Sequence, residues 1–171
     1  MTRLPSGTDG SPAAVVVGPS ARGAWRRLGI SRNGGQLLEE AEAVWLQVGN
    51  VYADSRGFAG TTSFDGSQVR FHHEVGEPGD DVGSLCWDGE NLVETGSNLD
   101  GSTFLEIWTP LPGSEGETGS WRAEGCQVVR VGRHVVHVDG RSGTYLLTTA
   151  PGSDPETRDP DVVRDQIGPP P

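Results

Sequence analysis

Lysine is absent from this 171-residue chain, and all 13 of its cationic side chains are arginines. Without a lysine amine the chain cannot form a Schiff base with a carbonyl substrate or with pyridoxal phosphate, and it has no P-loop lysine. The 24 acidic residues outnumber the arginines and give a net charge of −11. Nucleic acids and anionic membrane surfaces require a basic face, so neither is expected as a partner.

Long apolar runs and recognisable targeting segments are also missing. No run of about 18 apolar residues occurs, which predicts no membrane-spanning helix. The amino-terminal residues, MTRLPSGTDG, contain no apolar signal-peptide region, so a soluble cytoplasmic protein is expected. Cysteine is scarce: Cys86 and Cys126 are too few for a zinc site, and without a secretion signal we expect two free thiols.

The common catalytic and cofactor motifs are absent as well. The chain contains no HExxH, no GxSxG, no GxGxxG that opens a helix, and no calcium-binding loop of the right spacing. We therefore predict neither a metal nor a cofactor, and any catalysis would depend on positioning and acid–base chemistry.

Proline divides the chain into a central segment and two tails. Residues 1–22 contain three prolines and residues 151–171 contain six, whereas the 128 residues between them contain three. Segments rich in Pro, Gly, Ser and Asp bury too little apolar area to become ordered, so both tails are predicted to be flexible. The domain is expected to cover residues 23–150.

Within that domain, glycines separate short runs rich in Val, Trp, Phe, Thr and Leu, a spacing typical of strands and turns. The predicted strands are 24–30, 42–48, 51–56, 58–63, 68–75, 83–88, 91–96, 102–109, 119–131 with a bend at Gly125, 133–139 and 143–149. One short helix is expected over 36–42. Four Asp-Gly pairs, which begin at residues 65, 88, 100 and 139, match the positive φ of type I′ hairpin turns. The pattern predicts an all-β fold, a single antiparallel up-and-down barrel of about ten strands, with a β-sandwich as the alternative.

The first predicted strand reads GAWRRLGI, and its Gly-x-Trp pattern resembles the lipocalin and fatty-acid-binding (calycin) superfamily. The segments VWLQVGNVYADSR, FAG, VRFHHEV, DVGSLCWDGENLVETG and FLEIW are also similar to a family of short bacterial and fungal barrel proteins with no assigned activity. The resemblance covers roughly residues 23–112. It implies a calycin-type barrel with an internal cavity, and it implies no particular ligand.

Alternation along a strand sorts side chains onto two faces. On several predicted strands an ionisable group shares a face with apolar residues. These sets are Tyr52, Asp54 and Arg56; Val69, Phe71, His73 and Val75; Leu85 and Trp87; Leu92 and Glu94; and Phe104, Glu106 and Trp108. A buried charge is costly unless it is paired, so these groups either pair with one another or line a wet cavity.

The functional interpretation is a set of polar groups within an aromatic pocket. The predicted catalytic residues are Asp54, His73, Glu94 and Glu106, and the predicted ligand-binding residues are Tyr52, Arg56, Trp87, Phe104 and Trp108. Arg56 would clamp a carboxylate or phenolate. A glutamate beside tryptophan would have a raised pKa and act as an acid or base. The structural alternative is a salt bridge between Asp54 and Arg56 at a strand end, with Glu106 paired to an arginine.

Three functions are consistent with these observations. The first is a small-molecule-binding barrel that catalyses a cofactor-free cyclisation, isomerisation or dehydration in a biosynthetic pathway. The second is a non-catalytic carrier or sensor, including a haem carrier with His73 or His134 as the axial ligand. The third is a protein–protein adaptor. A cavity of about 300 Å³ or more favours the first two, and a filled interior favours the third. The sequence leaves the oligomeric state open, with a dimer among the alternatives.

Overall fold

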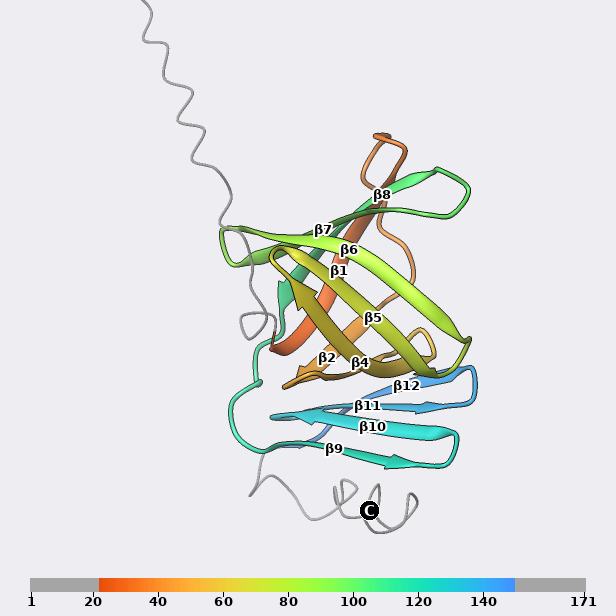
Figure 1. Ribbon diagram of the computed structural model, residues 1–171. Helices are drawn as coiled ribbons and strands as arrows, with labels where there is room; N and C mark the ends of the chain where they lie inside the picture. The colour runs from red at the N-terminus through yellow and green to blue at the C-terminus, as the bar shows by residue number, and fades with distance from the viewer. Residues whose placement is uncertain (1–21, 150–171) are drawn as a thin grey trace, which may run out of the picture.

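The computed structural model describes residues 22–149, and all of its regular elements are β-strands (Figure 1). Eight strands form a closed antiparallel barrel in chain order, with the last strand hydrogen-bonded to the first. These are β1 (Gly23–Arg32), β2 (Val44–Val48), β3 (Val51–Asp54), β4 (Phe58–Asp65), β5 (Gln68–Val75), β6 (Gly79–Asp88), β7 (Asn91–Ser97) and β8 (Thr103–Pro110). The predicted tails, 1–22 and 151–171, lie outside the described residues except for Arg22.

The other four strands form a separate antiparallel sheet in the order β12-β11-β10-β9. They are β9 (Thr118–Ala123), β10 (Cys126–Val131), β11 (His134–Asp139) and β12 (Ser142–Leu147). In Figure 1 this sheet lies below the barrel, and its two middle strands contact β2 and β3. The predicted all-β class and antiparallel barrel are confirmed, but the expected single barrel of about ten strands is wrong.

Two local expectations are also wrong. The segment 119–131 is not one bent strand but the hairpin β9–β10, which turns at Glu124 and Gly125. The segment 36–42 forms no helix. Instead, Leu38 exchanges two backbone hydrogen bonds with Ile30, at 2.8 and 2.9 Å, so this stretch pairs with β1 through an isolated antiparallel bridge. A helix of so few residues has little stability of its own, and pairing with β1 replaces it.

Glycine at the first of two loop residues makes most of the tight hairpins. Gly66, Gly89 and Gly140 follow the aspartates of three predicted Asp-Gly turns, and their φ angles lie between 58° and 62°. Asn33 is the one non-glycine residue of positive φ within 22–149. The turns therefore have the type II′ pattern, with glycine at the first position, rather than type I′. The fourth pair, Asp100-Gly101, lies in a longer loop between β7 and β8.

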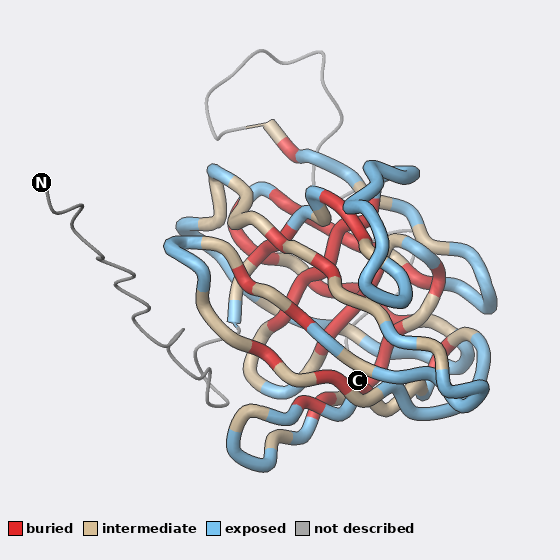
Figure 2. The backbone as a smooth tube through the Cα atoms, turned by 90° about the horizontal axis from the view of Figure 1, so that it is seen from above, coloured by how far each residue is buried: buried red, intermediate tan, exposed pale blue. Residues whose placement is uncertain are grey.

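Aromatic side chains fill the barrel interior. The buried cluster consists of Trp25, Ala43, Trp45, Tyr52, Val69, Phe71, Leu85, Leu92 and Trp108. Ring centroids lie 5.1 Å apart for Tyr52 and Phe71, and 5.8 Å apart for Trp45 and Trp108. Edge-to-face packing of this kind stabilises a core beyond the area that it buries. Seen from above, buried stretches gather in the middle of the molecule and exposed ones lie along the rim (Figure 2).

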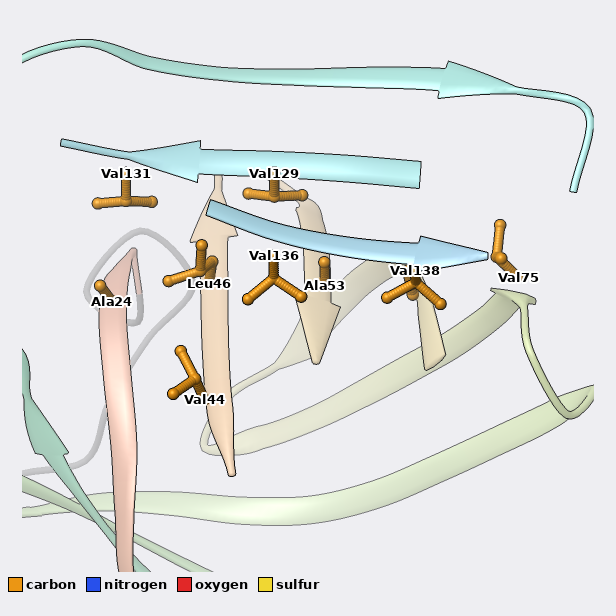
Figure 3. Packing of buried hydrophobic residues seen from close by; sticks show 10 residues of the cluster. Ala24, Val44, Leu46, Ala53, Val75, Val129, Val131, Val136 and Val138 are labelled. Carbon is orange, nitrogen blue, oxygen red and sulfur yellow. The ribbon is translucent and has the colours of Figure 1, made fainter. Parts of the chain in front are cut away.

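A second apolar cluster joins the barrel to the four-stranded sheet. From the sheet it contains Val129, Val131, Val136 and Val138, and from the barrel Ala24, Val44, Leu46, Ala53, Ala59 and Val75 (Figure 3). Val75 was expected on the same face as His73. A register shift between β4 and β5 turns Val75 toward the sheet, whereas His73 stays inside the barrel.

Candidate functional site

Four barrel strands carry an arginine or a buried carboxyl group on their inner faces. Arg27 lies on β1, Asp54 on β3, Glu94 on β7 and Glu106 on β8, and Arg56 follows β3 in the turn to β4. All three carboxyl residues are buried. Glu94 and Glu106 are direct partners across β7 and β8. Two negative charges facing each other are destabilising unless a cation or a proton lies between them.

Arginines neutralise two of these three carboxyl groups. Arg27 NH1 donates to Glu106 Oε1 at 2.7 Å, and both side chains are only 7% exposed. Arg56 binds Asp54 bidentately, at 2.9 Å through Nε and 2.7 Å through NH2, and its backbone N–H donates to the same carboxylate at 2.8 Å. Arg56 NH1 also lies 3.4 Å from Glu106 Oε1. Asp54 therefore fixes the position of the Arg56 guanidinium, and Glu106 has a cation of its own in Arg27.

Glu94 is the carboxyl group left over. It forms no ion pair with any of the residues 22–149. Burial and repulsion by Glu106 raise the pKa of Glu94 to about 8, against the opposing effects of Arg56 and the Trp108 indole. The side chain fits because Gly83 faces it: a Cβ at Gly83 would lie 2.6 Å from Glu94 Oε1. At neutral pH the site thus holds two ion-paired carboxylates and one neutral carboxylic acid.

A cavity of about 30 Å³ lies among these groups, enough for about one water molecule. Its walls are Trp45, Asp54, Arg56, Phe58, Phe71, Asp81, Glu94 and Trp108. The Arg56 guanidinium carbon lies 4.9 Å from the centroid of the Phe58 ring and 5.5 Å from that of Trp108. The side chain of Arg56 is about one-third exposed (34%). Arg56 is therefore both a wall of the cavity and its boundary with solvent.

Three buried polar atoms in the barrel have no hydrogen-bond partner among the described residues: Tyr52 Oη, His73 Nε2 and Trp108 Nε1. His73 Nε2 lies 3.2 Å from Asp81 Oδ2, which is close enough for an ion pair but lacks hydrogen-bond geometry. The Tyr52 ring packs against Phe58, Phe71 and His73, and burial strongly raises the pKa of its hydroxyl. Trp108 is the member of this group that lines the cavity, with its indole N–H close enough to Glu94 to lower that residue's pKa.

The structure brings four predicted site residues to the cavity wall: Asp54, Arg56, Glu94 and Trp108. Glu106 lies behind them in its ion pair with Arg27. His73 stacks on Phe58 with ring centroids 4.8 Å apart, on the aromatic ring that Arg56 also covers. Tyr52 packs inside the barrel against Phe71.

The remaining two predicted ligand-binding residues lie elsewhere. Trp87 packs against Trp25, at 5.8 Å between ring centroids, outside the cavity wall. Phe104 covers Gly96, where a Cβ would lie 2.5 Å from the Phe104 ring. Phe104 lines a separate open hollow of about 620 Å³ over β6, β7 and β8, together with uncharged residues such as Ser84 and Thr95.

Sequence reasoning missed five residues of the site: Arg27, Trp45, Phe58, Phe71 and Asp81. Three of them carried a usable signal, and alternation already places Phe71 on the same face as His73. Arg27 is two positions after Trp25, so alternation places both on the same face of β1, and Trp45 alternates with Gln47 in the same way. Asp81 carried none, because its position depends on the pairing of β5 with β6.

The histidines and cysteines outside the cavity have local partners. Both ring nitrogens of His134 are engaged, one with the Tyr145 hydroxyl and one with the Pro112 carbonyl, each at 2.8 Å. Cys86 and Cys126 are free thiols. Cys126 Sγ lies 3.0 Å from His137 Nε2, and burial and Asp139 raise the pKa of the Cys126 thiol. A raised pKa disfavours the thiolate that a nucleophile requires.

Comparison with known proteins assigns no family: the chain matches no protein-family model, no curated protein and no solved structure. Within residues 22–149 no three His, Cys, Asp or Glu side chains converge as metal ligands, and no helix has the length and apolarity to cross a membrane. The closed antiparallel barrel is compatible with a calycin-like fold. The site itself therefore carries the functional argument.

Proposed function

We propose that this chain is a small-molecule-binding β-barrel, and that its ligand is held at the cavity between Arg56, Glu94 and Trp108. The observation that carries the proposal is Glu94, a buried carboxyl group that faces another carboxyl group and has no cation of its own. Perturbed acids of this kind concentrate at functional sites. An apolar side chain opposite Glu106 would serve the fold at lower cost.

The chemistry available at this site is proton transfer to a bound molecule. Asp54 and Glu106 form ion pairs with arginines, so of the three buried carboxyl groups Glu94 is the one free to exchange a proton. With a pKa of about 8 it is a neutral acid at pH 7 and lies near the value that suits an acid–base catalyst. A cofactor-independent isomerisation, cyclisation or dehydration requires this kind of group in an apolar pocket.

The ligand reaches this site through Arg56. The cavity holds about 30 Å³ with Arg56 in place, so an organic molecule requires that side chain to move. Arg56 lies in the turn between β3 and β4 and is partly exposed, so its guanidinium has solvent on one side. Movement of a gating side chain of this kind accompanies binding in many sites that are closed when empty.

A fragment screen read by nuclear magnetic resonance tests the proposal. Binders should shift the indole N–H signal of Trp108 in the wild type and lose most of their affinity in Glu94→Gln. Glu90→Gln is the matched control, because Glu90 lies exposed in the turn between β6 and β7. A screen in which no fragment shifts Trp108, or in which both variants bind alike, would contradict the proposal.

A protein–protein adaptor is the second candidate, and the filled interior favours it. In that case the interior serves stability alone and partners bind the acidic exterior. Partner capture would then be unaffected by Glu94→Gln, and the fragment screen would give no binder at Trp108. The two functions therefore predict opposite outcomes from the same pair of variants.

A further inference from the structure

We propose that the cavity between Arg56, Glu94 and Trp108 recognises a small organic cation. The Arg56 guanidinium holds the position of this cation until the ligand displaces it. This inference rests on the proposed function, since it names the class of ligand for the same cavity. The cavity wall combines four aromatic rings, Trp45, Phe58, Phe71 and Trp108, with the carboxyl groups of Asp54, Asp81 and Glu94. Aromatic faces and carboxylates together are the groups that bind ammonium and amidinium ions.

Arg56 shows that a planar cation fits this arrangement. Its guanidinium lies over the faces of Phe58 and Trp108 and is held bidentately by Asp54. A ligand cation in this position would make the same contacts with the two rings and with Asp54. The small volume of the cavity is then a consequence of Arg56 occupying the site, and it does not oppose ligand binding.

The balance of charge also favours a cation. With Glu94 protonated and Glu106 paired to Arg27, the remaining charge pair of the site is Asp54 with Arg56. If Arg56 swings out toward solvent, Asp54 is left as a buried carboxylate without a partner. A bound cation restores that pairing.

The Trp108 indole lies in the same wall. Trp108 is 1% exposed and lines the cavity, and its N–H is close enough to Glu94 to lower that residue's pKa without meeting hydrogen-bond geometry. The Trp108 ring is also one of the two faces that a cation in the position of Arg56 would cover. A ligand in the cavity therefore changes the surroundings of the indole N–H, which makes this group the spectroscopic reporter of binding.

Three probes of nearly equal size and shape separate the ligand classes: benzamidine, which is a cation, benzamide, which is neutral, and benzoate, which is an anion. Each is titrated into the wild type and into Arg56→Ala, and binding is followed by calorimetry and by the indole signal of Trp108. We expect benzamidine alone to bind, and to bind Arg56→Ala at least about tenfold more tightly, because the variant needs no displacement.

In Arg56→Ala, binding of benzamidine should also release a proton from Glu94, because there the ligand adds a cation to the cavity and replaces none. Its affinity for Arg56→Ala should therefore rise roughly tenfold between about pH 6.5 and about pH 8.5, and this rise should vanish when Glu94→Gln is added to the variant. The groups that face Glu94 are Glu106 and Trp108 on β8, Asp54 on β3, Arg56 in the β3–β4 turn, and Asp81 and Gly83 on β6. Among the carboxyl groups of this set, Asp54 and Glu106 are held in ion pairs with arginines and Asp81 is exposed. Glu94→Gln therefore isolates the titration of Glu94.

The outcomes separate this inference from the proposed function. Equal binding of benzamide shows that the cavity binds small molecules but overturns the cation class. Binding of benzamidine to Arg56→Ala but not to the wild type identifies Arg56 as a permanent structural plug, which also overturns the inference. If Arg56→Ala fails to fold, as judged by circular dichroism, the wild-type titration with the three probes decides the question alone.

Discussion

Glu94 is the residue at which folding and pH are most directly linked. In the folded chain it keeps its proton up to a pKa of about 8, whereas the ordinary value is 4.5. Between these values the unfolded chain binds fewer protons than the folded one, so the free energy of unfolding falls as the pH rises. We expect a contribution of about −1.4 kcal/mol for each pH unit in this window, and Glu94→Gln removes it.

Urea unfolding of the wild type and of Glu94→Gln at several pH values measures this contribution. The two proteins should have similar stability near pH 5, and the variant should become progressively more stable than the wild type until about pH 8. Above that pH the difference should level off, because Glu94 is ionised in both states. Parallel pH profiles for the two proteins would show that Glu94 titrates at its ordinary pKa.

Glu106 should respond in the opposite way. Its ion pair with Arg27 is almost fully buried, so Glu106→Gln leaves an arginine inside the barrel with only the longer ion pair to Glu40, at 3.6 Å. The expected loss is about 3–5 kcal/mol, or roughly ten degrees in Tm. The double variant Glu106→Gln with Arg27→Met removes the stranded cation and should recover most of that loss. A stable single variant would contradict a structural role for this pair.

These two glutamates show what the sequence could and could not predict at the site. Strand alternation placed Asp54, Glu94 and Glu106 on inner faces, and the structure agrees. The sequence could not say which glutamate has an arginine, because the partner of Glu106 lies 79 residues away on β1. That contact depends on closure of β8 against β1, which turns two remote strands into neighbours.

Among the structural elements, the two-residue hairpin loops reverse the chain between neighbouring strands, and glycine serves two different purposes in them. Gly66 and Gly132 both stand first in a two-residue loop with positive φ, at 60° and 56°. A Cβ at Gly66 would enter open space, whereas at Gly132 it would collide with the backbone oxygens of Gly113 and Glu115. Gly66 is needed only for its backbone conformation, whereas Gly132 also leaves room for the linker between the barrel and the sheet.

Alanine substitution should separate these two requirements. Gly66→Ala introduces only the strain of positive φ and should cost about 1 kcal/mol. Gly132→Ala adds a steric clash with the linker and should cost about 2 kcal/mol more. Thermal denaturation of both variants provides the comparison. Equal losses would mean that the linker moves away without penalty.

The sequence predicts an element correctly where its structure depends on local residues, and incorrectly where its structure depends on pairing with a distant strand. Glycine-bounded runs located the barrel strands closely, because alternation and turns are local properties. The segment 36–42 was mistaken for a helix because its backbone partner, Ile30, belongs to β1. The run VWLQV in β2 is apolar on both faces, and such a run indicates a strand covered on both sides. The prediction of a single barrel overlooked this signal, which the sheet β9–β12 over the outer face of β2 explains.

At the scale of the whole molecule, barrel and sheet share a core that neither completes alone. The outer faces of β2 and β3 are buried by valines of β10 and β11. Gln127 of β10 donates to the backbone oxygens of Tyr52 and Gly60, at 2.6 and 3.0 Å, and so bonds the sheet to two barrel strands. Loss of the sheet would expose apolar residues and leave buried carbonyl groups without donors.

This shared core predicts one cooperative unfolding transition for residues 22–149. Four tryptophans, Trp25, Trp45, Trp87 and Trp108, lie on barrel strands, and Trp121 lies on β9. In a Trp121→Phe background, fluorescence therefore reports the barrel alone, whereas far-UV circular dichroism reports all twelve strands. The two probes should give the same denaturant midpoint, which is the standard test of a two-state transition.

A substitution between the two layers extends this test. Val136 is fully buried between sheet and barrel, so Val136→Ala should lower both midpoints together, with a loss of about 1–3 kcal/mol. Thr144→Ala, at an exposed position of β12, is the control and should change stability by no more than about 0.5 kcal/mol. If circular dichroism falls before barrel fluorescence, the sheet opens first. Arg56 lies in the β3–β4 turn, whose Gly57 packs against the β11–β12 turn at Arg141, so opening of the sheet would then also loosen the boundary of the cavity.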